Sequence, residues 1–362
     1  MMMQYENSSL DLIEALSNAF GPSGFEDDVL AVLRRFGGSL GEFSEDSLRN
    51  LYLYRKENTG NKPVLMLDAH SDEVGFLVHS VRPDGTLRVA SLGGWDKFTL
   101  SSSPVLVRNA LGQHIPGILA SKPYLYMDAA QRSQGCPDIS RMAVDIGAVS
   151  AAQAVEEFHI RPGEPVAPDT RFAFDATHGI LRGKAFDCRL GCAAILEALR
   201  QLQGEELAFD IVAVFSAQEE LGCRGARVAV NHVKPQIAFC FEGCPADDTL
   251  GAGDPPQTVL GKGPMLRFMN GSIVCSPRYQ RYVLDLAGRK GLLVQTAVRT
   301  AGANDAGVIN TACDGIPAVV AGIPVRYTHS CNGLAYYGDF AATASLAVET
   351  LRALTAEDLR AF

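Results

Sequence analysis

The second half of this chain alternates short apolar runs with helix-like segments, and this alternation limits the folds open to it. After Asp187, the runs at 211–215, 237–241, 292–298 and 318–323 have the length and composition of buried strands. Residues 190–202, 276–290 and 343–354 are predicted as helices. Apolar strands separated by helices are typical of a parallel sheet covered on both faces. The pattern therefore predicts an α/β fold with a mostly parallel sheet flanked by helices.

The first 73 residues supply further elements of the same kind. Residues 9–35 predict two helices separated by a Gly-Pro-Ser-Gly break at 21–24. Ser23 and Glu26 have the spacing of a capping box at the start of the second helix. A short strand at 51–54 and a buried run at 64–67 follow.

Residues 74–176 have a different sequence pattern. Short alternating runs are separated by turn sequences at 83–85, 109–112 and 161–163, which predicts a small antiparallel barrel or sandwich. Residues 121–140 lack apolar periodicity and are expected to form a mobile loop. Because this β segment interrupts the α/β pattern, we expect an inserted domain at 74–176 and a main domain formed by 1–73 and 177–362.

Polar side chains follow the predicted strands at the point where each strand ends. They are His70 and Asp72 after 64–67, Glu219 and Glu220 after 211–215, Glu242 after 237–241, and His329 beyond 318–323. Asp187 lies just before the helix at 190–202, where the positive helix end favours a carboxylate. In open α/β sheets, ligands bind at the carboxyl ends of the strands. We therefore expect these side chains to gather at one edge of the sheet.

Several carboxylates cannot remain ionised together without cations. Histidine and carboxylate ligands suit Zn²⁺, with Co²⁺ and Mn²⁺ as alternatives, and Asp187 has two oxygens with which to bridge two ions. Each residue alone has a plainer interpretation: His70 as a buried core histidine, Glu219 and Glu220 as a solvated pair, Asp187 as a helix cap. Their joint placement favours a site for two divalent metal ions. The glycine-rich stretch 302–307, which contains Asp305, either shapes the pocket or forms a plain turn.

Composition excludes several classes of function. The chain has 32 basic and 41 acidic residues and a net charge of −9, which disfavours nucleic-acid binding. It has no apolar run of about 18 residues, so we expect no membrane span, and its N-terminus does not resemble a signal peptide. Nine cysteines without a secretion signal indicate reduced thiols and a cytoplasmic location. The pairs Cys188/Cys192 and Cys240/Cys244 lack the spacing of a zinc site and are interpreted as core thiols.

The residues around the predicted site resemble those of the glutamyl aminopeptidase family, cocatalytic metallopeptidases that include the tetrahedral (TET) aminopeptidases. The resemblance covers nearly the whole chain. Seven collinear motifs carry it: Asp68-Ala69-His70-Ser71-Asp72-Glu73-Val74-Gly75-Phe76, Val144-Asp145-Ile146-Gly147-Ala148, Gly183-Lys184-Ala185-Phe186-Asp187-Cys188-Arg189, Glu219-Glu220-Leu221-Gly222-Cys223-Arg224-Gly225-Ala226, Gly261-Lys262-Gly263-Pro264, Asn304-Asp305-Ala306-Gly307 and Ile323-Pro324-Val325-Arg326-Tyr327-Thr328-His329-Ser330.

The resemblance implies a role for each candidate residue. His70, Asp187 and Glu242 would hold one metal, and Asp187, Glu220 and His329 the other. Glu219 would be the general base for a water that bridges the metals, and Asp72 would hydrogen-bond the far nitrogen of His70. The expected activity is removal of N-terminal residues from peptides, and the expected assembly is a homo-oligomer of up to twelve subunits, formed through the inserted domain.

The sequence also departs from the family pattern. Glu242 stands where many relatives carry Asp, Tyr124 and Tyr126 where relatives often have His, and Asn304 where Thr is frequent. These differences leave the preferred N-terminal residue open. The alternatives are an N-acyl amino acid deacylase, a glycosidase of endoglucanase type, and, in a different class, a non-catalytic metal-binding scaffold.

Overall fold

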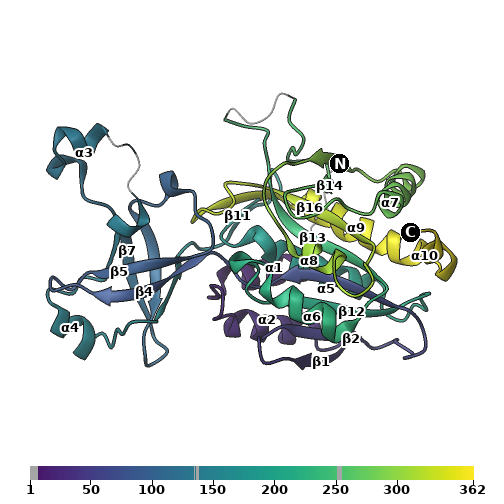
Figure 1. Ribbon diagram of the computed structural model, residues 1–362, viewed down its shortest axis with the longest axis horizontal. Coiled ribbons are helices and arrows are strands. Elements are labelled where there is room, and N and C mark those ends of the chain that lie inside the picture. The colour runs from purple at the N-terminus through teal and green to yellow at the C-terminus, as the bar shows by residue number, and fades with distance from the viewer. Residues whose placement is uncertain (1–6, 134, 136–137, 251–254) are drawn as a thin grey trace.

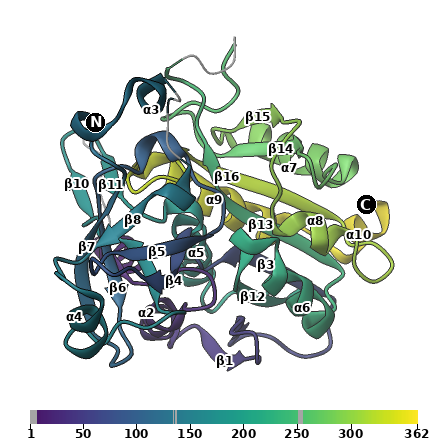
Figure 2. The same ribbon diagram turned by 60° about the vertical axis from the view of Figure 1, so that its left-hand side comes forward.

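A computed structural model describes residues 7–133, 135, 138–250 and 255–362 of the chain. Two lobes are visible in Figure 1: an α/β lobe that carries the C-terminus, and a β-barrel lobe built from the middle of the first half of the chain. Figure 2 shows the molecule turned so that the barrel lobe comes forward.

The α/β lobe is built on one eleven-stranded sheet. Its main order is β1 (Gly41–Glu45), β2 (Leu51–Arg55), β12 (Asp210–Ser216), β3 (Val64–His70), β13 (Ile237–Pro245), β16 (Ala318–Arg326), β17 (Gly333–Tyr336), β11 (Ile180–Gly183) and β10 (Ala173–Asp175). Strand β14 (Met265–Met269) pairs with β16 and with β15 (Gln295–Val298). The four central strands β12, β3, β13 and β16 are parallel, whereas the flanking strands of the main order are antiparallel.

Helices cover both faces of the sheet. Alternate residues of a strand point to opposite faces, so each face has an apolar core of its own. Leu65 and Leu67 of β3 belong to the larger core, together with α1 (Asn7–Asn18), α2 (Asp27–Gly37), α5 (Phe186–Gln201), α7 (Pro277–Lys290) and α9 (Tyr337–Ala353). Met66, between them, belongs to the second core with α6 (Arg224–Val233) and α8 (Asp305–Asn310). The short helix α10 (Ala356–Ala361) ends the chain. The predicted α/β fold is therefore confirmed.

The inserted lobe is a closed six-stranded barrel in the order β4, β5, β8, β7, β6, β9. Its strands are β4 (Gly75–Val81), β5 (Leu87–Leu92), β6 (Ser103–Arg108), β7 (His114–Ala120), β8 (Ala143–Asp145) and β9 (Pro165–Pro168), and all of its strand pairs are antiparallel. The predicted antiparallel β insertion is confirmed as a barrel. Its own apolar core includes Phe76, Val105 and Val144.

The segment 121–140 contains short helical turns rather than only loop. These are η2 (Tyr124–Tyr126), α3 (Ala129–Ser133) and the start of η3 (Ile139–Arg141), while 134 and 136–137 lie outside the described residues. Helix α4 (Ala151–Glu156) and the turn η1 (Lys97–Thr99) complete this lobe. Within the described residues, no helix is long and apolar enough to cross a membrane.

Two local predictions differ from the structure. The capping box at Ser23 and Glu26 is wrong: helix α2 begins at Asp27 without a side-chain cap, and the Ser23 hydroxyl instead donates to Asp72 at 2.5 Å. The strand expected at 292–298 begins only at Gln295, because Leu292 and Val294 pack against the main core as the chain leaves α7. In both cases tertiary contacts override a local pattern.

A buried ion cluster fixes the N-terminal segment against the edge of the sheet. The Arg189 guanidinium, 1% exposed, donates to the backbone oxygens of Leu16, Gly21 and Ser71. It also pairs with the Glu73 carboxylate at 3.3 Å, and Lys184 donates to the same carboxylate. Because Ser71 and Glu73 flank Asp72, this cluster holds the segment that follows β3 in place.

We expect Arg189→Met to destabilise the fold by about 3–5 kcal/mol, because it leaves a buried carboxylate short of a cation and several carbonyls without donors. Chemical denaturation measures the change. The matched control is Arg352→Met, at an ion pair whose arginine side chain is 38% exposed, where a change of at most about 1 kcal/mol is expected. Equal stabilities of the two variants would contradict this account of the cluster.

Candidate active site

The central parallel strands bring the predicted site residues to one edge of the sheet. His70 is the last residue of β3, Glu242 lies in β13, and Glu219 and Glu220 form the turn η4 (Glu219–Leu221) after β12. His329 lies in the connection between β16 and β17. This turn allows two consecutive glutamates to reach the same site.

Asp187 enters the site through an interruption at the start of α5. Its φ of −87° and ψ of 107° are not helical, so regular helix begins only after Cys188. The backbone of β13 passes directly beside it: a Cβ on Gly243 would lie 2.4 Å from the Asp187 Cα. Only a residue without a side chain permits this close approach of β13 to the Asp187 backbone.

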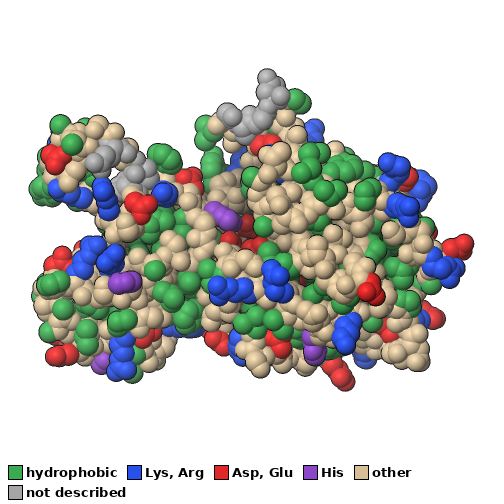
Figure 3. Space-filling view, viewed as in Figure 1, with side chains coloured by type: hydrophobic (Ala, Val, Ile, Leu, Met, Phe, Trp, Pro, Cys, Tyr) green, Lys and Arg blue, Asp and Glu red, His purple; other side chains and the backbone are tan. Residues whose placement is uncertain are grey.

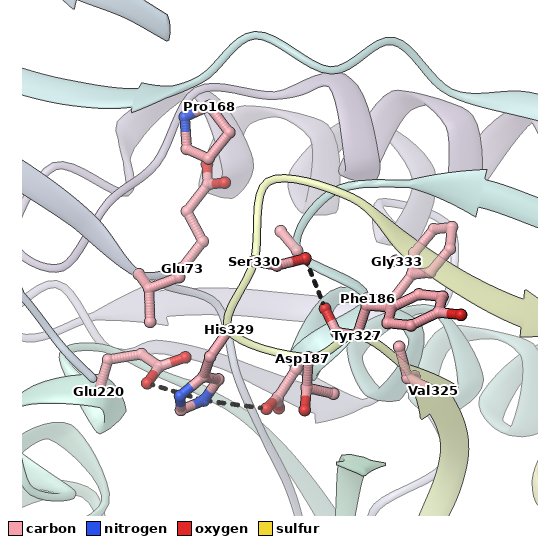
Figure 4. Close-up of a pocket in the computed structure, with 13 residues that line it drawn as sticks. Glu73, Pro168, Phe186, Asp187, Glu220, Val325, Tyr327, His329, Ser330 and Gly333 are labelled. Carbon is pink, nitrogen blue, oxygen red and sulfur yellow. Dashed lines mark hydrogen bonds and ion pairs between the residues drawn. The ribbon is translucent and has the colours of Figure 1, made fainter. Parts of the chain in front are cut away.

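The Asp187 carboxylate faces two histidines, one with each oxygen. Its Oδ1 lies 3.1 Å from the Nε2 of His70, and its Oδ2 lies 3.5 Å from the Nε2 of His329. The Nε2 of His70 is also 3.7 Å from Glu242, and that of His329 is 3.4 Å from Glu220. Figure 4 shows His329 between Glu220 and Asp187. Two groups of His and carboxylate side chains therefore share Asp187.

Each group has the composition and spacing of a metal-ligand set. The potential ligand atoms of Asp187, Glu220 and His329 lie within 4.8 Å of one another, as do those of His70, Asp187, Glu242 and Cys188. The donor types, imidazole and carboxylate with one thiol, suit Zn²⁺ and similar ions. The structure thus brings the five predicted residues together. Cys188 is fully buried in the main core, as its interpretation as a core thiol expects, and its thiol also lies beside the first group.

The electrostatics of the cluster favour a cation. Burial and the nearby Asp187 carboxylate raise the pKa of Glu220 to about 8 and that of Glu242 to about 7. Burial opposes ionisation of Asp187, yet hydrogen bonds from His329 and His70 lower its pKa. Burial likewise opposes protonation of His329, but the Asp187 carboxylate raises its pKa to about 9. Without a bound cation, the site therefore retains protons that a divalent ion would displace.

Asp72 connects His70 to the glutamate turn. The Nδ1 of His70 lies 3.4 Å from the Asp72 carboxylate and 3.2 Å from the Asp72 backbone oxygen. The same carboxylate accepts the backbone N–H groups of Glu219 at 2.9 Å and Glu220 at 3.2 Å. Burial opposes ionisation of Asp72, but the hydrogen bond from His70 lowers its pKa. Asp72 therefore orients both the imidazole and the turn that carries the two glutamates.

A pocket opens beside this cluster between the two lobes. It is lined by Asp187, Glu220 and His329, by Tyr327 from the connection after β16, and by Pro168 at the end of barrel strand β9. In the space-filling view, acidic side chains and a histidine are visible in the hollow between the lobes (Figure 3). Both lobes therefore contribute to the space in which a substrate would lie.

The comparisons with known proteins agree with this geometry. Residues 50–346 match the family model described as M42 glutamyl aminopeptidase. The chain is 32% identical over 331 residues to the glutamyl aminopeptidase of Lactococcus lactis, covering 91% of this chain and 92% of that protein. The crystal structure of a TET aminopeptidase from a marine sediment archaeon of the Thaumarchaeota has a TM-score of 0.94, with 32% identity, over 98% of this chain and 99% of that one.

A TET1 peptidase of Pyrococcus horikoshii, described as assembling into a tetrahedron or a large octahedral shell, has a TM-score of 0.83 and 25% identity, over 96% of this chain and all of that one (100%). The fold and the site define a hydrolase of the metallopeptidase class. More narrowly, the chain belongs to the M42 glutamyl aminopeptidase family, whose members act on N-terminal residues.

We expect Gly243→Ala to lower aminopeptidase kcat/KM by about 100-fold, because the new Cβ would displace the backbone of Asp187. Turnover of aminoacyl substrates and far-UV circular dichroism together separate misplacement from unfolding. Gly288→Ala, in helix α7, is the control and should retain activity, because nothing lies within 4 Å of the position of its new Cβ. Full activity of the Gly243 variant would show that Asp187 tolerates displacement.

Proposed function

We propose that the protein is an aminopeptidase that depends on two divalent metal ions. His70, Asp187 and Glu242 would hold one ion, and Asp187, Glu220 and His329 the other. The observation that carries the proposal is the shared Asp187 carboxylate, which faces a different histidine with each oxygen. Zn²⁺ fits these ligands best, with Co²⁺ and Mn²⁺ as alternatives.

Ions bound there would lower the pKa of a water molecule and polarise the scissile carbonyl. Glu219 would accept the proton from the attacking water and pass it to the leaving amine. Burial raises the pKa of the Glu219 carboxyl, which suits a group that alternately gains and loses a proton. Asp72 would hold the His70 ring and the N–H of Glu219 in place, as carboxylates behind metal ligands commonly do.

The pocket supports peptide substrates. Its lining includes Tyr327 and Ser330 together with the Asp187 and Glu220 carboxylates. A free α-amino group is a cation at neutral pH and would be attracted to these carboxylates. We infer that the N-terminal residue of a peptide enters this pocket and that the rest of the peptide leaves between the lobes.

The barrel lobe is the part that we propose for self-association into a homo-oligomer, with a dodecamer as the expected form. It exposes large apolar side chains, including Phe98 at 84% and Val149 at 82%. The structural relative from Pyrococcus horikoshii is described as assembling into closed shells. In the described residues, all eight cysteines are free thiols, which supports work in a reducing compartment such as the cytoplasm.

Glu219→Gln should lower kcat by about 10²–10⁴-fold while the bound metal is retained, because the amide cannot accept the proton. Elemental analysis and turnover of aminoacyl substrates test both parts. Glu156→Gln, in the barrel helix α4, is the control. Loss of metal with intact turnover would overturn the assignment of Glu219.

Metal binding should release protons and strengthen as pH rises. The pKa values of Glu220 (about 8), Glu242 (about 7) and His329 (about 9) lie near or above neutrality, so at pH 7 a cation competes with protons on these side chains. Calorimetric titration of the metal-free protein with Zn²⁺, in buffers of different ionisation enthalpy, measures the number released. Binding without proton release, or weaker binding at higher pH, would contradict this electrostatic account.

A further inference from the structure

A further cluster of potential ligands includes Glu219, which also has a ligand atom within 4.8 Å of those of His70 and Glu220. It consists of Glu219, Cys223 at the N-cap of α6, and Asp305 at the start of α8. One potential ligand atom from each residue lies within 4.8 Å of the other two. Cys223 and Asp305 are only 4% and 3% exposed. None of the roles proposed above uses Cys223 or Asp305.

Asp305 has an oxygen that the described protein leaves unsatisfied. Its Oδ2 accepts the Ser216 hydroxyl at 2.6 Å, whereas its Oδ1 is buried without a hydrogen-bond partner among the described residues. The Oδ1 of Asp68 is also buried without a hydrogen-bond partner among the described residues. The negative charges of Asp68 and Asp305 repel each other. Buried carboxylate oxygens are normally paired, so this unmet acceptor indicates a place for a cation.

The donor set selects a kind of ion. The Cys223 thiol donates to the Oε1 of Glu219 at 3.3 Å, which places sulfur beside the carboxylate. One thiolate and two carboxylates, with water as the fourth ligand, would suit a four-coordinate ion such as Zn²⁺. Hard ions such as Mg²⁺ prefer oxygen ligands and would avoid the sulfur.

We propose that Glu219, Cys223 and Asp305 form a third site for a thiophilic divalent cation of the Zn²⁺ type, and that its occupation inhibits the enzyme. On binding, the Cys223 thiol gives its proton to the solvent and its sulfur forms a bond to the ion, without any change of oxidation state. The ion also takes a Glu219 oxygen, so this carboxylate can no longer accept a proton from water. The inhibition therefore rests on the proposed role of Glu219, whereas the binding itself does not.

The third site fills only after the other two. Two cations held by the neighbouring ligand groups would repel a third, and the Coulomb energy between charges falls only slowly with distance at a partly buried site. The site therefore binds weakly and responds to an excess of metal. The activity of the peptidase should therefore rise with the first two equivalents of zinc and fall with a third.

Zinc titration of the full-length enzyme tests both parts of the proposal. Calorimetry on protein already loaded with two equivalents should detect a third, and turnover should fall over the same concentration range, whereas Mg²⁺ should cause neither effect. With Cd²⁺ as probe, the third equivalent should add a thiolate-to-metal absorption band. Inhibition is expressed relative to the maximal activity of each variant.

Cys223→Ser should raise the zinc concentration for half-inhibition by about tenfold or more, corresponding to about 1.4 kcal/mol of lost binding, and should remove the added Cd²⁺ band. Cys275→Ser, at another buried thiol in the core beside α8, is the matched control and should keep both the band and the inhibition. Asp305→Asn provides a second variant, with a similar expected loss of zinc binding, if the serine variant does not fold.

Binding of only two equivalents at every zinc concentration would overturn the third site. Equal inhibition of the wild type, Cys223→Ser and Asp305→Asn would also overturn it. Binding of a third equivalent without any fall in turnover would refute the inhibition while leaving the metal site in place. Failure of the proposed function is distinguishable, because turnover would then persist after chelation of all metal, whatever the third equivalent does.

Discussion

The carboxylate of Asp187 lies between two histidines, and the arrangement of the site depends on that contact. Its oxygens face His70 on one side and His329 on the other. The contact requires a break in the helical backbone at Asp187 and a β13 residue without a side chain, Gly243, against it. The end of β3, the start of α5, strand β13 and the β16–β17 connection are therefore positioned relative to one carboxylate.

The protein handles buried negative charge in two different ways within a few residues. Glu73 receives cations from the chain itself, since Lys184 and Arg189 both pair with it. Glu220 and Glu242 face histidines and other carboxylates instead, and burial raises the pKa of each. The first arrangement stabilises the fold, because the charges are neutralised permanently. The second leaves buried carboxylates whose negative charge metal ions from solution can neutralise. A catalytic centre that binds metals is expected to have this property.

Much of the fold could be predicted from local sequence patterns, and there are physical reasons why the remaining elements could not. The strands at 211–215, 237–241 and 318–323 were predictable because each is a continuous apolar run buried on both faces. Strands β17, β11 and β10, at one end of the sheet, are short and partly exposed, so they leave little signal in the sequence. Ser23 follows a capping pattern, but the Asp72 carboxylate offers it a better-placed acceptor across the molecule.

The sequence by itself determined which polar residues lie near the carboxyl ends of the central strands, because apolar runs mark where buried strands lie. With Asp187 at the start of a helix, that was sufficient to select His70, Asp187, Glu219, Glu220, Glu242 and His329 as candidates, although β13 continues past Glu242 to Pro245. Only the tertiary structure decided which of their atoms face one another, and only it placed Cys188, Cys223 and Asp305 beside them. The reason is that contacts between residues far apart in the chain depend on strand register and backbone approach, which no local pattern encodes.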